Sequence, residues 1–426
     1  MRVLMLNERD LRHPLAGGVE VHLEETATRL AADHDIEMTV LAAGFPGGAE
    51  DEVQGGVRYV RFGDRGFSYY AMLPGRARAE WATGRYDLVV ENLCKLLFFS
   101  NLYLPSAPRL GLVHHLFGLS AFRQVSAPIA SYVVSTEALL PLAYRRCPMV
   151  VVSPSTRDDL VKRGLRRDLI RVVPNGLDHR LFRPADPPHV DPNLVLFVGR
   201  LEYYKGVDLL LESWPKVREA RPQARLVVVG AGNAETAMRS RAAALGLGDS
   251  VHFAGFVSQE EKVDWLQRAA LLVQPSRKEG WGLTVLEANA CATPVVATRV
   301  PGLRDSVRNG ENGMLVPSGD PDALAAGIAR ILGDADLRER LARGALTWAS
   351  RFRWDAVTRS LAECLRAAAR RAPLPEVPDF LASTRTDELS FAVGTGEAAR
   401  DTASFPARNG AAGGDASVPS DRGSDR

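Results

Sequence analysis

Two acidic residues, Glu279 and Glu287, stand eight positions apart in a glycine-containing segment of the chain. Glu279 follows an aliphatic run at 271–274 that is typical of a buried strand. Glu287 would lie about two turns into the helix that follows, because a helical turn takes about 3.6 residues. One carboxylate could then meet the hydroxyl groups of a sugar while the other meets a ribose. The alternative is that Glu279 is an ordinary loop residue and Glu287 an exposed helical charge.

The residues between these two acids favour anion binding. Gly280, Gly282, Leu283 and Thr284 would present backbone N–H groups at the start of the helix. A helix N-terminus carries unpaired N–H groups and a partial positive charge, so it is a ready site for phosphate groups. The segment therefore predicts a diphosphate-binding turn between two carboxylates.

Two cations occur in a comparable position earlier in the chain. Arg200 and Lys205 lie directly after the aliphatic run 194–198 and before a helical pattern at 207–220. At the carboxyl end of a parallel strand, two such side chains can face the phosphates of a nucleotide. The alternative is a pair of solvated loop charges, which is the usual state of Arg and Lys.

The elements that must position these residues form two series of alternating strands and helices. The expected strands lie at 3–6, 38–41, 88–90, 110–113 and 150–152, and then at 194–198, 226–229, 251–253, 271–274, 294–297 and 313–316. Helical patterns separate many of these runs, which is typical of βαβ units. The sequence therefore predicts an α/β fold with two doubly wound, Rossmann-like domains, whose ligands bind at the carboxyl ends of the strands and in the crevice between the domains.

Changes in composition suggest how the chain is divided. The proline- and aspartate-rich segment 183–192 is typical of a linker. We expect an N-terminal domain at 1–187, a C-terminal domain at 188–352 and a last helix near 353–371. Residues 372–426 have little periodicity and are rich in Ala, Gly, Ser, Pro, Asp and Arg, which predicts a disordered tail.

Charge and cysteine content exclude several classes of protein. The formal net charge of the 426 residues is only +2, which gives no reason to expect a nucleic-acid partner. The four cysteines show no CxxC spacing, which argues against a zinc site and a disulfide framework and favours a reducing cytoplasm. The apolar start of the chain is too short for a signal peptide, and polar residues and prolines interrupt the apolar stretch near 127–144, so we expect no transmembrane segment.

Together these motifs resemble the retaining glycosyltransferases of family 4, also called the group 1 glycosyltransferases, which have the GT-B fold. The resemblance covers residues 1 to about 370 and implies an enzyme that moves a hexose-type sugar from a nucleotide-diphosphate sugar to an acceptor hydroxyl. It also implies that the last helix crosses back to the first domain. Besides the segment with the two acids, it depends on Val-Gly-Arg-Leu-Glu at 198–202, Lys-Gly at 205–206, Val-Pro-Asn-Gly-Leu-Asp at 173–178, Phe-Arg-Pro at 182–184, Val-Val-Gly-Ala-Gly at 228–232 and Pro-Val-Val-Ala-Thr at 294–298.

The resemblance assigns roles in the second domain. It implies that Arg200 and Lys205 bind the donor diphosphate, Glu287 the ribose and Glu279 the transferred sugar. The residues whose backbone would hold the sugar and the diphosphate are Gly282, Leu283 and Thr284.

In the first domain the resemblance adds a glycine pair and a histidine. Gly17 and Gly18 are similar to the family's Gly-Gly loop after the first strand, where small residues would let the backbone approach the donor phosphate or sugar. His114 resembles the family's strand-end histidine near the transferred sugar, with His115 as the less favoured choice. The alternative for Gly17 and Gly18 is a plain turn. The alternative for His114 is a structural role.

The chain departs from the family pattern at two places. Ala292 stands where glycine is usual, and Pro301 and Gly302 stand where a Gly-Gly pair is common. These changes could alter the choice of donor, but both acids and both cations are present.

We expect neither a metal nor another cofactor. The Asp-x-Asp spacings at 33–35 and 334–336 lie at helix ends or turns, where Asp makes local hydrogen bonds. Arg200, Lys205 and the helix start near Leu283 would already stabilise the leaving diphosphate. No carboxylate of the first domain stands out as a nucleophile, which favours attack on the same face as the leaving group.

The acceptor is open: a glycan, a lipid-linked sugar or a small molecule would each fit. The stretch 58–78 mixes aromatic residues with cations and could touch an anionic membrane at its inner face, and the basic stretch 162–167 could help. Solvated loops with a few packing aromatics are the alternative. Competing functions are a GT-B epimerase or phosphorylase, and a catalytically silent subunit that binds a nucleotide sugar.

Overall fold

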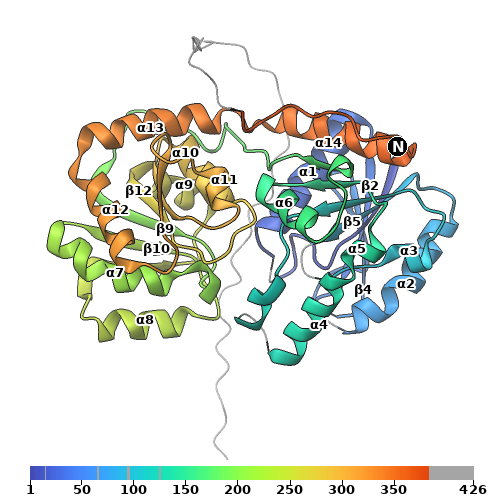
Figure 1. Ribbon diagram of the computed structural model, residues 1–426, viewed down its shortest axis with the longest axis horizontal. Coiled ribbons are helices and arrows are strands. Elements are labelled where there is room, and N and C mark those ends of the chain that lie inside the picture. Colours follow the sequence, from blue (N-terminus) through green and yellow to red (C-terminus); the bar gives the residue numbers. More distant parts are fainter. Residues whose placement is uncertain (15, 65–66, 94–95, 124–125, 383–426) are drawn as a thin grey trace, which may run out of the picture. The chain divides into compact units, whose positions relative to one another are not determined.

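The computed structural model describes residues 1–14, 16–64, 67–93, 96–123 and 126–382 (Figure 1). Strands of the described residues form an eight-stranded and a six-stranded sheet. The first sheet contains β1 (Arg2–Leu6), β2 (Glu37–Ala43), β3 (Asp51–Gln54), β4 (Val57–Phe62), β5 (Leu88–Leu93), β6 (Arg109–Val113), β7 (Met149–Val151) and β8 (Ile170–Val172). The second contains β9 (Asp191–Val198), β10 (Arg225–Val229), β11 (Val251–Gly255), β12 (Ala269–Gln274), β13 (Val295–Thr298) and β14 (Gly313–Val316).

The helices lie between the strands. Those before β9 are α1 (Gly18–His34), α2 (Phe67–Ala82), α3 (Ser100–Tyr103), α4 (Ala127–Ala138), α5 (Leu140–Ala143) and α6 (Pro154–Lys162). Those after β9 are α7 (Val207–Ala220), α8 (Glu235–Ala244), α9 (Gln259–Arg268), α10 (Leu283–Ala290), α11 (Leu303–Ser306), α12 (Pro321–Gly333), α13 (Ala335–Ala349) and α14 (Trp354–Ala369).

Both sheets are doubly wound. The first has the order β3-β4-β2-β1-β5-β6-β7-β8 and the second β11-β10-β9-β12-β13-β14. All pairs are parallel except β3 with β4. The order reverses beside β1 in the first sheet and beside β9 in the second, so ligands are expected at the carboxyl ends of these strands. The predicted fold class, α/β with two Rossmann-like sheets, is confirmed.

The central strands are buried because helices cover both faces of each sheet. Val3 and Leu4, whose side chains point to opposite faces of β1, are both fully buried, as are Leu271 and Leu272 of β12. This burial explains why the aliphatic runs in the sequence are continuous and do not alternate with polar residues.

The last helix, α14, packs on α1. The guanidinium group of Arg366 donates a 2.6 Å hydrogen bond to the carbonyl oxygen of His34, at the end of α1. The proline-rich segment 183–192 joins β8 to β9 and therefore connects strands of the two sheets. The domain limits at 187/188 and 352/353 stay predictions.

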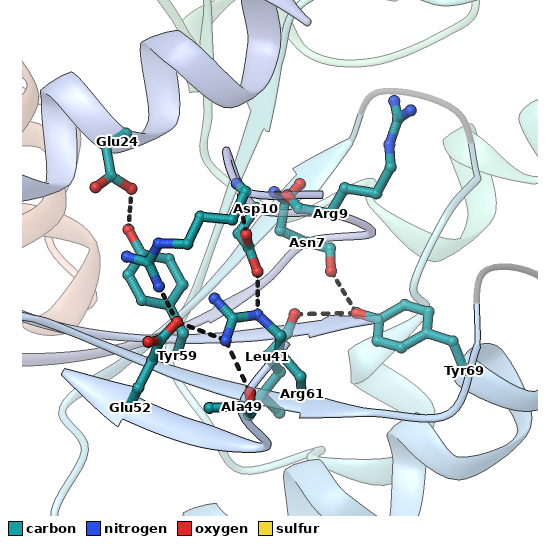
Figure 2. A network of polar contacts seen from close by, with 11 residues as sticks. Asn7, Arg9, Asp10, Glu24, Leu41, Ala49, Glu52, Tyr59, Arg61 and Tyr69 are labelled. Atoms are coloured by element: carbon teal, nitrogen blue, oxygen red, sulfur yellow. Dashed lines mark hydrogen bonds and ion pairs between the residues drawn. The ribbon is translucent and has the colours of Figure 1, made fainter. Parts of the chain in front are cut away.

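Part of the aromatic and basic stretch at 58–78 is buried in the core, whereas Phe67 is 89% exposed and Arg76 and Arg78 are exposed, so membrane contact by this stretch stays a prediction. The stretch covers most of β4 and of α2. Tyr59 is 1% exposed and its hydroxyl group donates to Glu24, while the guanidinium group of Arg61 pairs with Asp10 (Figure 2). The alternation of residues in β4 buries these side chains, and internal carboxylates neutralise the cation.

Part of the predicted tail is also packed. Leu374 and Phe380 are 5% and 8% exposed, and the guanidinium group of Arg171 donates to the carbonyl oxygens of Leu374 and Pro375 at 2.9 and 2.7 Å. The prediction of disorder is therefore wrong for residues 372–382, because Leu374 and Phe380 are buried and Arg171 of β8 binds the backbone of this segment. Residues 383–426 lie outside the described residues.

Candidate functional site

The predicted cations and carboxylates meet where the strand order of the second sheet reverses. Arg200 and Lys205 follow β9, and Glu279 follows β12, the strand hydrogen-bonded to β9. Neighbouring parallel strands end at the same edge of a sheet, so loops that are distant in sequence become adjacent there. The structure thus brings three of the predicted residues to one place.

Lys205 and Glu279 form an ion pair. Lys205 Nζ lies 2.7 Å from Glu279 Oε2, which also accepts a 3.2 Å hydrogen bond from Ser276 Oγ. Each charged side chain of the pair is 14% exposed. Burial is the largest influence on the pKa of Lys205 and alone would lower it, but the Glu279 carboxylate and Tyr204 together raise the pKa above its usual value. Lys205 is therefore a permanent cation at this site.

A glycine lets the two loops approach. Gly206 has a φ of 74°, the left-handed region, and begins α7 directly after Lys205. A methyl group at this position would lie 2.1 Å from the carbonyl oxygen of Pro275. Only glycine allows both this turn and this contact, so Gly206 fixes the distance between Lys205 and the segment that carries Glu279.

Arg200 faces the glycine pair of the first sheet. Its Nη2 donates a 2.8 Å hydrogen bond to the Tyr204 hydroxyl group. A methyl group on Gly17 would lie 3.5 Å from Arg200 Cζ, and one on Gly18 would lie 3.4 Å from Leu283 Cδ1. The loop after β1 therefore lies against both the cation after β9 and the first residue of α10.

The Gly17 loop is held by a buried ion pair that the sequence analysis missed. Glu20 accepts a 2.7 Å hydrogen bond from the backbone N–H of Gly17 and pairs with Arg9 at 3.0 Å. The side chains of Arg9 and Glu20 are 6% and 3% exposed. Glu20 stands three residues after the N-cap of α1, the capping-box position, and that spacing was the available signal.

Glu287 lies in α10, as predicted, and has an unpredicted partner. Helix α10 begins after Gly282, whose φ of 89° requires glycine, and contains Leu283, Thr284 and Glu287. Lys262 Nζ of α9 lies 2.9 Å from Glu287 Oε1, and the two side chains are only 18% and 15% exposed. No motif in the sequence links α9 to α10, so the Lys262 contact could be found only in the structure.

His114 ends up buried beside a second histidine. It is 4% exposed and its ring centroid lies 5.2 Å from that of His22 of α1. Burial lowers the pKa of His114 to about 3, with a smaller contribution from His115, so the imidazole is neutral. Its Nε2 has no hydrogen-bond partner among the described residues. Its backbone is close to Gly280, since a methyl group there would lie 2.6 Å from the His114 carbonyl oxygen.

Two further hydrogen bonds join loops from the two sheets. Lys278 Nζ donates a 2.5 Å hydrogen bond to the carbonyl oxygen of Phe117, after β6. Asp305 of α11 accepts a 3.0 Å hydrogen bond from the backbone N–H of Ser155, in the first turn of α6. Asp305 lies three residues after Gly302, so the loop that begins at Pro301 contacts α6.

The two Asp-x-Asp segments lie at helix ends. Asp334 caps α13 by accepting a 2.9 Å hydrogen bond from the backbone N–H of Leu337, and Asp35 ends α1 with a φ of 52°. Within the described ranges, no three His, Cys, Asp or Glu residues are grouped so as to hold a metal ion. A search of the same ranges for a helix long and apolar enough to cross a membrane finds none.

Comparison with known proteins identifies the family. The family model described as "Glycosyltransferase Family 4" matches residues 16–181, and "Glycosyl transferases group 1" matches residues 179–348. A D-inositol 3-phosphate glycosyltransferase of Streptomyces bingchenggensis is 31% identical over 396 residues, which cover 83% of this chain and 86% of that protein. The same-named protein of Acidothermus cellulolyticus is 41% identical over 209 residues, 45% of this chain and about half (46%) of that protein.

Solved structures show the same fold. Sucrose-phosphate synthase from Thermosynechococcus elongatus matches with a TM-score of 0.74 and 23% identity, over 87% of this chain and 100% of that chain. HepE of Anabaena, solved in complex with UDP-glucose, matches with a TM-score of 0.68 and 21% identity, over 86% of this chain and 100% of that chain. The family that the motifs predicted is confirmed: this chain belongs to the group 1 glycosyltransferases and has their GT-B fold.

Proposed function

We propose that this enzyme transfers a hexose from a nucleotide-diphosphate sugar to an acceptor hydroxyl with retention of anomeric configuration and without a metal ion. The observation that carries the proposal is the group formed by Lys205, Glu279 and Arg200 at the reversal of the second sheet, opposite Gly17. Such a position combines fixed cations with a backbone that leaves room for a phosphate group.

The chemistry needs stabilisation of the leaving group. Glycosyl transfer develops negative charge on the departing phosphate and positive charge on the sugar ring. Arg200, Lys205 and the N-terminus of α10 at Leu283 and Thr284 would stabilise the departing diphosphate. Because these groups are charged or dipolar before the donor arrives, the stabilisation needs no rearrangement and no metal ion.

The carboxylates would hold the two sugars of the donor. In the proposal Glu279 accepts hydrogen bonds from the transferred hexose, while its ion pair keeps Lys205 protonated beside the diphosphate. Glu287 accepts hydrogen bonds from the ribose, with Lys262 holding its carboxylate in place. His114 is neutral and would contribute a hydrogen bond near the hexose from its unpartnered Nε2.

Retention would follow from attack on the face that the diphosphate leaves. Glu20 is the carboxylate beside the Gly17 loop, and its oxygens are taken by the N–H of Gly17 and by Arg9. A carboxylate held in this way is a poor nucleophile, which supports same-face attack assisted by the leaving phosphate. Incubation with a 2-fluoro donor followed by mass spectrometry tests this: a covalent glycosyl-enzyme adduct would contradict it.

The name of the relatives, D-inositol 3-phosphate glycosyltransferase, gives the first acceptor to test. D-inositol 3-phosphate is a polyol monophosphate, and we propose an acceptor of this class, with glycans and lipid-linked sugars as the competing outcomes of an acceptor screen. Hydrolysis of the donor in the absence of acceptor would separate an active transferase from a silent sugar-nucleotide-binding subunit.

A thermal-shift panel of UDP, GDP, ADP and their glucose conjugates tests the donor site. A ligand present at 100 times its dissociation constant stabilises the fold by about 2.7 kcal/mol, which is a measurable rise in melting temperature. We expect at least one nucleoside diphosphate to raise the melting temperature of the wild type but not that of Lys205→Met. Lys216→Met is the matched control, because Lys216 is an exposed lysine of α7 away from the site. The absence of any shift in the wild type would refute the donor site.

A further inference from the structure

The outer face of α4 and α5 is apolar. The exposed side chains on this face are those of Ile129, Tyr132, Leu139 and Leu142, with exposures of 54%, 59%, 47% and 82%. They recur at intervals of three and seven residues, which places them along one side of a helix. An isolated exposed apolar residue is normal, but a row of four on one face indicates an interaction surface.

This face has no charge. From residue 126 to residue 144 the only ionisable acid or base in the sequence, apart from tyrosine, is Glu137. Glu137 is 2% exposed and points inward, where it accepts hydrogen bonds of 2.7 and 2.8 Å from the backbone N–H groups of Phe117 and Gly118. The outward residues between the apolar ones are small or carry hydroxyl groups, such as Ser131 and Ser135.

Two cations border the apolar row. Arg145 and Arg146 lie one residue after the end of α5, and both are exposed. With the single acid turned inward, the surface from α4 to residue 146 presents apolar side chains and positive charge without an opposing carboxylate. That combination is complementary to the interface of a membrane, where anionic lipid headgroups cover the apolar acyl chains.

The dimensions exclude a spanning helix and fit one that lies in the interface. The 12 residues of α4 extend about 18 Å at about 1.5 Å per residue, against about 30 Å for the hydrocarbon core. A tyrosine such as Tyr132 is well suited to the depth of the lipid headgroups, because its ring is apolar and its hydroxyl group can form hydrogen bonds with water. Figure 1 shows α4 and α5 next to each other in the first half of the chain.

We propose that the α4–α5 surface, formed by Ile129, Tyr132, Leu139, Leu142, Arg145 and Arg146, docks onto a membrane that contains anionic lipid. The surface is connected to the site, since Glu137 holds the backbone of Phe117 and Lys278, next to Glu279, donates to the Phe117 carbonyl oxygen. The docked enzyme therefore keeps the loop after His114 beside the lipid surface. This inference does not depend on the proposed function, because docking needs no donor.

Co-sedimentation of the full chain with vesicles tests docking. Vesicles of phosphatidylcholine with 30% phosphatidylglycerol are expected to bind the wild type about tenfold or more tightly than phosphatidylcholine alone, since each basic residue adds about 1 kcal/mol near an anionic surface. The double variant Tyr132→Asp/Leu142→Asp should lose binding to both, and Arg145→Ser/Arg146→Ser should lose only the preference for anionic lipid. Val53→Asp, at a 70% exposed valine of β3, is the matched control and should bind as the wild type does.

Unfolding of a variant is distinguished from loss of docking by its melting temperature and by its donor-binding thermal shift, both of which should match the wild type. The inference is overturned if the wild type does not bind anionic vesicles, or if Tyr132→Asp/Leu142→Asp binds them unchanged. It is also overturned if light scattering shows a wild-type dimer that the double variant dissociates while vesicle binding stays absent, because the apolar row would then be covered by a second copy of the chain.

Discussion

Lys205 Nζ and Glu279 Oε2 are 2.7 Å apart although 73 residues separate them in the chain. The contact joins the loop after β9 to the loop after β12, on either side of the reversal in strand order. A fixed distance between a cation and a carboxylate is what a diphosphate sugar would need, because the phosphate and the sugar hydroxyl groups are neighbours in the donor. The pair thus links the topology of the sheet to the proposed chemistry.

Removal of the Lys205 charge is predicted to affect transfer more than folding. Lys205→Met should lower kcat/KM by about 100- to 1,000-fold, the usual effect of removing one group that stabilises developing charge. The measurement is a coupled assay of nucleoside diphosphate release. Lys216→Met should retain wild-type activity, and a comparable loss in that control would show that the effect is not specific to the site.

Gly280→Ala is predicted to disturb the contact between the loops of the two sheets. The added methyl group would meet the His114 carbonyl oxygen at 2.6 Å, so the loop that carries Glu279 must shift. We expect kcat to fall at least about tenfold, because small displacements of a reacting group are costly. Gly75→Ala in α2, where a methyl group meets nothing within 4 Å, is the matched control and should be neutral or stabilising. Equal activity in the two variants would contradict the predicted displacement.

His114 predicts a pH dependence of stability. Its pKa is about 3 in the folded protein and about 6.5 for an ordinary histidine, so below pH 6.5 the unfolded chain binds a proton that the folded chain does not. Unfolding therefore becomes easier as the pH falls from 6.5 towards 3, by up to about 1.4 kcal/mol per pH unit for this group.

His114→Gln removes that contribution. Urea unfolding of wild type and variant at pH 7.0, 5.5 and 4.5 should show the stability advantage of the wild type shrinking as the pH falls. His22 contributes to the difference with the same sign, because its pKa is lowered by burial and also by the neighbouring His114. A difference that does not change with pH would mean that the pKa of His114 is the same in the folded and the unfolded protein.

Glu287 is predicted to recognise ribose hydroxyl groups. The wild type should bind a ribonucleoside diphosphate at least about tenfold more tightly than its 2′,3′-dideoxy analogue, because the analogue lacks the hydroxyl groups that would donate hydrogen bonds to the Glu287 carboxylate. Glu287→Gln should lose most of this discrimination while it retains the fold. Isothermal titration with both ligands measures the ratio of their dissociation constants. If that ratio is unchanged in the variant, Glu287 does not bind the ribose.

The sequence was sufficient to predict which residues meet at the edge of the second sheet, but not how each group is held. Glu279 and Glu287 could be placed because strand-to-helix turns at a sheet edge have one geometry and α10 has a regular period. Lys262 could not be assigned to Glu287, since the contact depends on how α9 packs against α10. The burial of Tyr59 and Arg61 could not be predicted, because mixed aromatic and basic residues occur both in surface loops and in strands whose charges are paired internally.

Residues 372–382 were misread for a related reason. Their composition is typical of disorder, and only the position of Arg171 on β8 gives Leu374 and Pro375 a place to bind. Low periodicity predicts the absence of regular secondary structure correctly, but it carries no information on whether an irregular segment is packed.

The most direct test of the central claim, that Arg200 and Lys205 hold the donor diphosphate, is isothermal titration of the nucleoside diphosphate selected by the thermal-shift panel, compared with its parent nucleoside. We predict that the wild type binds the diphosphate at least about 100-fold more tightly than the nucleoside, and that this ratio falls to within about tenfold in Arg200→Ala/Lys205→Met, since each charged hydrogen bond contributes about 1.5 to 3 kcal/mol. A double variant that keeps the wild-type ratio would contradict the account.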